Sequence, residues 1–272
     1  MREPTSTSAT SSAIGQGAAA FYRHVLEMLT VSGVPFLVGG AYAFHHYTGI
    51  KRNTKDLDIF IRRDDFQRLS EALSQAGYQT ELTYPHWLGK LFFNGDFIDI
   101  IFSSGNGIAE VDEAWFEYAA KASIFNVEAD ICPVEEMIWS KAFIMERERY
   151  DGADVAHLLR ACGDRLDWQR LLDRFDSCWR ILLSHFALFG FIYPGDRELI
   201  PAWIIGELLG RLREETRTPP PDHGTCFGTV LSREQYLPDI EQWGYRDGRL
   251  VPLGKMTERD AASWTDAIKN KQ

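Results

Sequence analysis

The sequence predicts an α+β protein: a small mixed β-sheet with flanking helices, followed by a helical region and an extended C-terminal tail. Three observations predict this fold class. Short apolar runs alternate with amphipathic, helix-like segments through the first half of the chain. The dipeptide Asn94-Gly95 joins two more apolar runs and is a strong hairpin signal, because a tight turn of this kind needs positive φ angles. From Pro133 the apolar spacing becomes helical and stays so to about residue 213.

The composition is that of an ordinary globular protein. The chain has 272 residues, of which 45% are hydrophobic and 25% charged, so it can bury a core as one large domain or two modest ones. The formal net charge of −10 provides no global basic field for nucleic acid, although it is compatible with a local basic patch. The four cysteines form no Cys-x-x-Cys pair, and the longest apolar run is too short to span a bilayer. We therefore expect reduced thiols, a cytoplasmic location and no membrane contact.

We expect four segments along the chain. Residues 1–17 are rich in Ser, Thr and Ala and are predicted to be a disordered leader without a signal peptide. An α+β core over residues 18–131 and a helical region over residues 132–215 follow. Residues 216–272 begin with the turn-rich RTPPPDHG and show little periodicity, which predicts a linker and a tail that wraps the body.

The strands and helices follow from apolar spacing and from glycine and proline boundaries. In the core we expect strands over residues 34–38, 57–61, 78–83, 88–93 and 97–102, and either one strand or a strand pair over 123–131. We expect helices over residues 18–31, 41–47, 64–76 and 111–118, and then 134–147, 151–159, 168–175, 177–189 and 198–213. Asp64 is the expected N-cap of the third of these helices, and Gly77 is its expected stop.

Three aspartates are the strongest candidates for a site. Asp56 and Asp58 lie two residues apart on one predicted strand, so their side chains share a face of the sheet. Asp99 lies in the middle of the apolar strand FIDIIF. Unpaired buried charge is costly, and a divalent cation such as Mg²⁺ is a natural counter-charge for carboxylates that converge. The alternative for Asp99 is a polar position on a half-exposed strand.

The segment before the acid pair has the features of a phosphate site. Gly39-Gly40 ends an apolar strand and opens a helix, which offers backbone N–H groups to phosphate oxygens. The loop that follows carries Lys51, Arg52 and Lys55, which could neutralise a triphosphate or form an ordinary solvated loop. Transfer of a nucleotidyl group uses two divalent ions to steady the attacking and leaving oxygens, and three convergent aspartates could hold them.

This order of motifs resembles the polymerase-β-like nucleotidyltransferase superfamily, which is marked by Gly-Gly or Gly-Ser, then Asp-x-Asp, then a third carboxylate. The phrase RNTKDLDIF is similar to the bacterial minimal nucleotidyltransferases and to AbiE-type toxins. The resemblance covers roughly residues 34–159. It departs in the 15 residues that separate Gly40 from Asp56, which is a little long, and in Gly40 itself, where many active members have serine.

The resemblance implies a role for each matching position. Asp56, Asp58 and Asp99 would be catalytic and would bind the metal. Nucleotide-binding residues would come from the glycine turn, the basic loop and two later helices: Gly39, Gly40, Arg52, Thr54, Lys55, Lys141 and Asp154. Asp151 is the alternative to Asp154 as the last acid, and Lys141 could instead be an ordinary helix-surface lysine.

We therefore expect a Mg²⁺- or Mn²⁺-dependent enzyme that moves a nucleoside monophosphate from an NTP, with ATP favoured, to an acceptor hydroxyl with release of pyrophosphate. The acceptor would be a small molecule, a protein or an RNA end. Two alternatives remain: an inactive nucleotide- or partner-binding module of the same fold, and a toxin-like nucleotidyltransferase that a protein partner neutralises.

Overall fold

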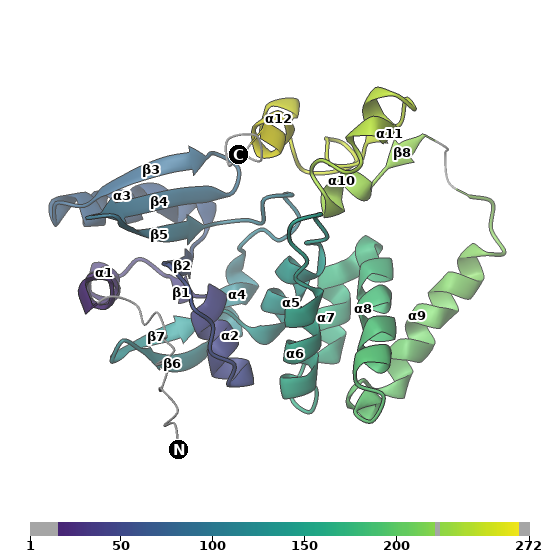
Figure 1. Cartoon of the computed structure of the whole chain (residues 1–272), viewed down its shortest axis with the longest axis horizontal. Helices are drawn as coiled ribbons and strands as arrows, with labels where there is room; N and C mark the ends of the chain where they lie inside the picture. The colour runs from purple at the N-terminus through teal and green to yellow at the C-terminus, as the bar shows by residue number, and fades with distance from the viewer. Residues whose placement is uncertain (1–15, 221–223, 267–272) are drawn as a thin grey trace, which may run out of the picture.

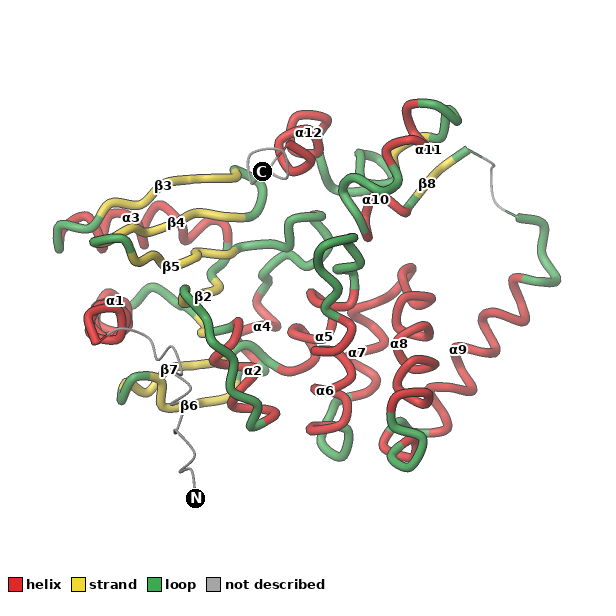
Figure 2. The backbone as a smooth tube through the Cα atoms, in the orientation of Figure 1, coloured by secondary structure: helices red, strands yellow, loops and turns green. Residues whose placement is uncertain are grey.

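A computed structural model describes residues 16–220 and 224–266 of the chain (Figure 1). The predicted leader therefore lies outside the described residues except for Gln16 and Gly17. The sheet occupies one side of the molecule, the helices that follow it occupy the other, and the C-terminal segment lies across the end of both (Figures 1 and 2).

The sheet has seven strands in the order β3-β4-β5-β2-β1-β7-β6. They are β1 (Leu37–Val38), β2 (Asp56–Phe60), β3 (Gln79–Tyr84), β4 (Leu88–Phe93), β5 (Asp96–Ile101), β6 (Ala120–Ile124) and β7 (Val127–Ile131). Strands β2 and β5 are parallel, as are β1 and β7, and the other neighbours are antiparallel. The sheet is thus mixed, and the predicted α+β fold class is confirmed.

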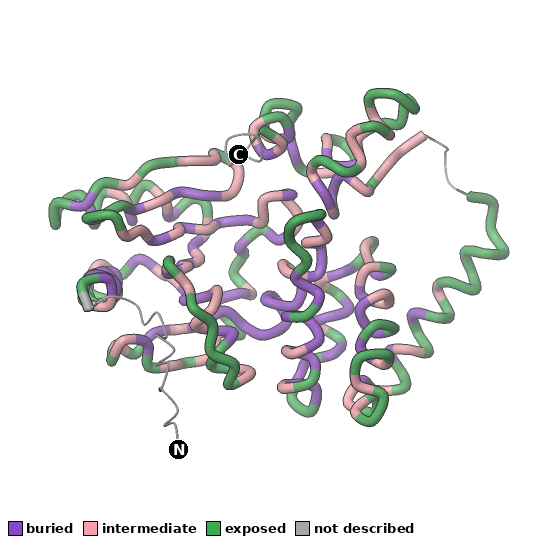
Figure 3. Tube along the Cα trace, in the orientation of Figure 1, coloured by how far each residue is buried: buried purple, intermediate pink, exposed green. Residues whose placement is uncertain are grey.

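One face of the sheet packs on the core. Helices α1 (Gln16–Ser32) and α3 (Phe66–Gln75) contact each other, and a Cβ on Gly89 of β4 would overlap the ring of Phe66. The side chains of strand β2 alternate between the two faces of the sheet (Figure 3). Leu57 and Ile59 are fully buried, whereas Asp56 and Asp58 are half-buried. The aspartates of this strand therefore point away from α1 and α3.

Two of the three hairpins in the sheet, β4–β5 and β6–β7, have two-residue turns. The predicted turn between β4 and β5 is confirmed, with φ of 50° at Asn94 and 91° at Gly95. The open choice over residues 123–131 resolves into a strand pair, because Phe125 and Asn126 adopt φ of 52° and 64°. A phenylalanine is not expected in this conformation, but here its ring packs edge-on against Tyr42 at 5.1 Å between ring centres.

The remaining helices of the body are mostly in the second half of the chain. They are α2 (Gly40–Thr48), α4 (Glu113–Glu117), α5 (Val134–Ala142), α6 (Gly152–Cys162), α7 (Trp168–Phe175), α8 (Trp179–Ile192) and α9 (Ala202–Glu215). Helix α2 packs on both β2 and α6, which joins the sheet to the helical region (Figure 1).

Three predicted helix boundaries were wrong for local reasons. Helix α5 ends at Ala142 because the chain turns back on itself, with a bridge between Met145 and Tyr150. Asp64 lies inside a 3₁₀ turn and does not cap a helix. Helix α9 begins at Ala202 because Pro201 interrupts the ladder of hydrogen bonds that the earlier start requires.

One stretch of the described chain, residues 168–192, is long and apolar enough by composition to cross a membrane. In the structure it is not one helix. Residues Asp176–Cys178 form a 3₁₀ turn between α7 and α8, and Asp176 has a φ of 37°. Buried side chains of both helices, such as Phe175 and Phe189, belong to the main core. The four cysteines all fall in the described residues and are free thiols.

The tail folds back onto the body and has a small hydrophobic cluster of its own, formed by Met256, Ala261 and Trp264. It contains α10 (Gly228–Leu231), α11 (Leu237–Glu241), α12 (Glu258–Asp266) and the short pair β8 (Thr225–Cys226) and β9 (Arg246–Asp247). The Ser232 hydroxyl donates to the Glu146 carboxylate at 2.7 Å, and the Asn106 amide donates to the Val230 carbonyl at 2.8 Å. The tail thereby bridges the loop after β5 and the turn after α5 (Figure 2).

Candidate active site

The parallel pairing of β2 and β5 brings the three predicted aspartates together. Asp58 and Asp99 are direct partners in the register of these strands, and Asp56 lies on the same face of β2. Each of the three carboxylates offers an oxygen, and these oxygens all lie within 4.8 Å of one another. Carboxylate oxygens at this spacing fit a hard divalent cation such as Mg²⁺ or Mn²⁺.

The charge of this cluster is not balanced by its own residues. Burial, together with the charges of Asp56 and Asp99, raises the pKa of Asp58 to about 7, although Lys141 and Arg149 act in the opposite direction. A carboxyl group that resists ionisation this strongly marks a place where a cation would be bound favourably. The donor set and its charge thus both fit a divalent metal.

The raised pKa of Asp58 predicts a pH dependence of stability in metal-free buffer. Between its ordinary value of about 3.9 and about 7, the folded state binds more protons than the unfolded state, so the free energy of unfolding falls as the pH rises. Asp58→Asn removes this loss and should stabilise the protein by about 2–4 kcal/mol at pH 8 but by much less at pH 4. Urea unfolding at both pH values measures the difference.

Asp130→Asn, on β7 of the same sheet, is the control for this prediction. Equal pH dependence of the free energy of unfolding in wild type and Asp58→Asn would contradict the prediction.

The Gly39-Gly40 turn is fitted to Asp58. The Gly39 N–H donates to the Asp58 carbonyl at 2.9 Å. This amide is therefore paired within the sheet, whereas the sequence analysis expected it to face a phosphate. Gly40 has a φ of 54°, and a Cβ there would overlap the Asp58 carboxylate. The departure from serine at this position therefore has a local cause: the carboxylate occupies the space. Helix α2 starts here, and its first N–H groups have no acceptor within the helix.

Lys90 is a site residue that the sequence analysis missed. It lies opposite Asp99 in the β4–β5 hairpin, and its ammonium group forms an ion pair with the Asp99 carboxylate. Its Nζ also lies 4.3 Å from the centre of the Phe97 ring. The signal was present in the sequence: a two-residue turn at Asn94-Gly95 fixes the hairpin register and pairs residue 90 with residue 99.

The predicted loop residues have contacts of different kinds. Arg52 forms an ion pair of 2.5 Å with Asp154 and lies over the ring of Phe44 at 4.1 Å. The Thr54 hydroxyl donates to the Asp56 carboxylate, which orients a predicted metal ligand. Lys55 is exposed, and its carbonyl accepts a hydrogen bond of 3.0 Å from the Tyr22 hydroxyl. The loop is thus held at both ends, and the Lys55 side chain is left at the surface.

Lys141 contacts both Asp154, the acid that the sequence analysis favoured, and its alternative Asp151. Its ammonium group lies 3.1 Å from Asp151 and 2.8 Å from Asp154. Arg149 pairs with Asp151 through two hydrogen bonds of 2.9 and 2.8 Å. Burial alone would raise the pKa of Asp151, but Arg149 and Lys141 hold it below its usual value. These cations face the Asp58 charge, so the site has a positive side as well as a negative one.

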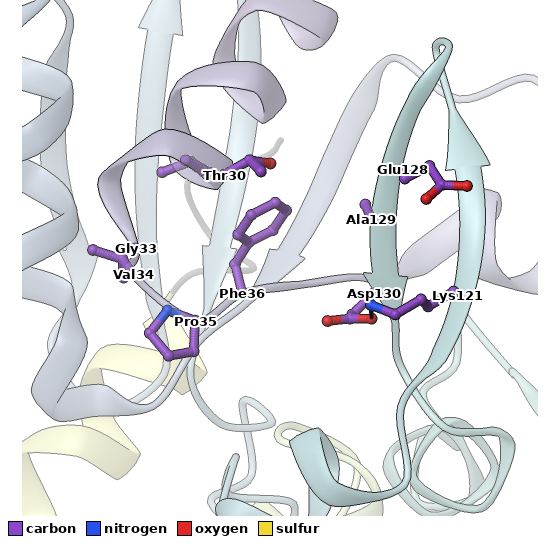
Figure 4. A pocket seen from close by; sticks show the side chains of 10 residues that line it. Thr30, Gly33, Val34, Pro35, Phe36, Lys121, Glu128, Ala129 and Asp130 are labelled. Carbon is purple, nitrogen blue, oxygen red and sulfur yellow. Dashed lines mark hydrogen bonds and ion pairs between the residues drawn. The ribbon is translucent and has the colours of Figure 1, made fainter.

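A cavity of about 290 Å³ lies elsewhere, between the end of α1 and the β6–β7 hairpin. Figure 4 shows Lys121 and Asp130 on the hairpin side and Phe36 and Pro35 on the other. None of the predicted site residues lines this cavity. The acid cluster and this cavity are therefore separate features.

A sequence-family model described as Aminoglycoside-2''-adenylyltransferase matches residues 22–100. The matched segment holds the Gly-Gly turn and all three aspartates. The match covers less than a third of the chain and agrees with the predicted resemblance to nucleotidyltransferases. It gives no support to the AbiE-type branch in particular.

Solved structures resemble the chain at low identity. The antibiotic-resistance factor ANT(2'')-Ia is 16% identical, with 61% of this chain and 95% of that chain covered, at a TM-score of 0.42. The lincosamide antibiotic adenylyltransferase LnuA is 16% identical, with 53% and 96% covered, at 0.37. A putative nucleotidyltransferase from Thermotoga maritima is 14% identical, with 45% and 81% covered, at 0.36. No curated protein sequence matches the chain significantly.

Proposed function

We propose that this protein transfers a nucleoside monophosphate from an NTP to a hydroxyl group of a small cationic acceptor, with release of pyrophosphate. The observation that carries the proposal is the convergence of Asp56, Asp58 and Asp99 on one face of two parallel strands, beside the start of α2. The family match covers this same segment.

Each residue of the site has a proposed role. Asp56, Asp58 and Asp99 hold a divalent metal, Mg²⁺ or Mn²⁺, which when bound would polarise the α-phosphate and neutralise charge on the phosphate oxygens. Asp99 also accepts the proton of the acceptor hydroxyl, whose oxygen bonds to the α-phosphorus as the bond to the leaving pyrophosphate breaks.

The phosphates are held from the other side of the site. The free N–H groups at the start of α2, including that of Gly40, suit phosphate oxygens. Lys141 and Arg149 supply positive charge, and Lys55 extends it at the surface of the loop. Arg52 and Asp154 contribute by fixing Lys141 and the loop rather than by meeting the nucleotide, because each is already engaged in the ion pairs described above.

ATP is the proposed donor and an aminoglycoside-like polyamine sugar is the proposed acceptor. The name of the matching family supports both choices. The net charge of −10 favours a cationic acceptor over an RNA end. A cytoplasmic location agrees with such a reaction, since ATP is its donor, and it stays a prediction.

The test is a transfer assay with each of the four α-labelled NTPs, with Mg²⁺, with Mn²⁺ and with EDTA. The acceptors are a panel of aminoglycosides and, as uncharged comparators, neutral oligosaccharides. We expect label from ATP to move to at least one aminoglycoside only when metal is present. No transfer from any NTP, together with no metal-dependent thermal stabilisation by any NTP, would overturn the proposal and favour an inactive module.

A second candidate is a toxin-like nucleotidyltransferase of the AbiE type, neutralised by a protein partner. The observation that favours it is the contact of Lys141 with Asp151 and Asp154, since that branch is marked by a lysine on a later helix and a further acid. Growth arrest on expression, relieved by Asp56→Ala, would support this candidate. Unimpaired growth at high expression would count against it.

A further inference from the structure

The turn that joins α5 to α6 carries part of the positive side of the site. Residues 143–151 fold back on themselves, and the Glu146 N–H donates to the Arg149 carbonyl at 2.9 Å. The Arg149 guanidinium donates to the Asp151 carboxylate, and its charge acts on Asp58 of the acid cluster. Because 61% of the Arg149 side chain is accessible, a phosphate group can reach it. The position of this turn therefore decides where one of the proposed phosphate contacts lies.

The C-terminal tail holds the outer side of the same turn. The Met145 N–H donates to the Leu231 carbonyl at 3.1 Å. The Glu146 carboxylate accepts a hydrogen bond of 2.7 Å from the Ser232 hydroxyl and forms an ion pair of 3.0 Å with Arg233. Ser232 is fully buried, and only 6% of the Glu146 side chain is accessible. A hydrogen bond to a charged group in such a dry place is among the stronger ones in a protein, so the tail fixes the turn firmly.

The same part of the tail also holds the loop that follows β5. The Asn106 amide donates to the Val230 carbonyl at 2.8 Å, and the Ser104 hydroxyl donates to the Asn106 side chain at 2.6 Å. Strand β5 carries Asp99 of the acid cluster. The neighbouring carbonyls of Val230 and Leu231 thus connect the strand on the acidic side of the site to the turn on its cationic side (Figure 1).

We propose that Glu146 and Ser232 are positioning residues for the nucleotide: their hydrogen bond clamps the α5–α6 turn so that Arg149 is held where the phosphates of the NTP bind. Neither residue touches the nucleotide itself. The inference rests on the proposed function, because it explains how one of the phosphate contacts of that site is placed. Glu146, Arg149 and Ser232 all lie outside residues 22–100, so this part of the site is not in the segment that the family model matches.

The test measures binding of α,β-methylene-ATP with Mg²⁺ to the full-length protein by isothermal titration calorimetry. Ser232→Ala removes the hydroxyl donor and should raise the Kd for the nucleotide about five- to tenfold, because the loosened turn no longer holds Arg149 in place. Arg149→Ala should raise the Kd by at least as much. In the Arg149→Ala background, Ser232→Ala should change the Kd by less than about twofold, since the clamp acts through Arg149.

Thr229→Val is the matched control. Thr229 is fully buried like Ser232, and its hydroxyl also donates to a carboxylate at 2.7 Å, but this carboxylate belongs to Asp247 within the tail. Thr229→Val should lower the thermal unfolding temperature as Ser232→Ala does and leave the Kd for the nucleotide at the wild-type value. The control therefore separates the clamp on the turn from a general weakening of the tail.

A wild-type Kd in Ser232→Ala or in Arg149→Ala, or losses that add fully in the double variant, would overturn the inference and leave the proposed function standing. Equal losses of affinity in Thr229→Val and Ser232→Ala would overturn it as well. No metal-dependent binding of the nucleotide by the wild type would overturn the proposed function and the inference with it. If Ser232→Ala does not fold, Glu146→Gln takes its place, because it keeps the length of the side chain, removes the charge and should show the same loss.

Discussion

Asp58→Asn is expected to lower kcat/KM for nucleotidyl transfer by about a thousandfold or more, which corresponds to roughly 4 kcal/mol of lost transition-state stabilisation. Asparagine keeps the shape of the side chain but removes the negative charge that a metal ion requires. Asp58 lies beside both other acids and against the Gly40 backbone, so no neighbouring carboxylate of the described chain can take the same position. The transfer assay with ATP and Mg²⁺ measures the loss.

The controls separate lost chemistry from lost structure. Asp130→Asn makes the same chemical change on β7 and should leave kcat/KM within about twofold, because exposed ion pairs contribute little. Asp58→Asn itself should be at least as stable as wild type in metal-free buffer, since the charge it removes is disfavoured by burial. A stable Asp58→Asn protein that transfers label within tenfold of wild type would contradict the role proposed for Asp58.

The acid cluster could be predicted because it depends on local rules. The alternation of side chains along a strand places Asp56 and Asp58 together. The position of Asp99 in an apolar strand indicated that it had a partner. The sequence did not give the parallel register that sets Asp99 beside Asp58, because β2 and β5 are separated by a helix and two further strands.

Other features depended on contacts between distant segments. The hairpin turn at Phe125 contains no glycine from which it could be predicted. It is supported by packing of the Phe125 ring against Tyr42 of α2. Arg149 lay in a charged stretch predicted only as a break between helices, and it meets Asp151 because the chain turns back at Met145. That turn is in contact with the tail through Glu146, which no local pattern could indicate.

Gly40→Ala is the second change with a large expected effect. Gly40 and Gly49 are the first residue of α2 and the residue that ends it, and both have positive φ, of 54° and 72°. Nothing lies within 4 Å of a Cβ on Gly49, whereas a Cβ on Gly40 would overlap the Asp58 carboxylate. Gly49→Ala should therefore cost only the conformational penalty of about 1 kcal/mol, and Gly40→Ala should cost about 3 kcal/mol or more.

The pair of variants separates backbone strain from displacement of Asp58. Gly49→Ala should keep nearly full transfer activity, because it leaves the site untouched. Gly40→Ala should lose about a hundredfold or more in kcat/KM, since a misplaced carboxylate no longer meets Asp56 and Asp99. The thermal unfolding temperature and the affinity for Mn²⁺ should both fall strongly in Gly40→Ala. In Gly49→Ala the affinity for Mn²⁺ should stay at the wild-type level. Equal losses of stability and activity in both variants would mean that backbone strain alone explains the glycine at position 40. The turn would then not be fitted to the Asp58 carboxylate.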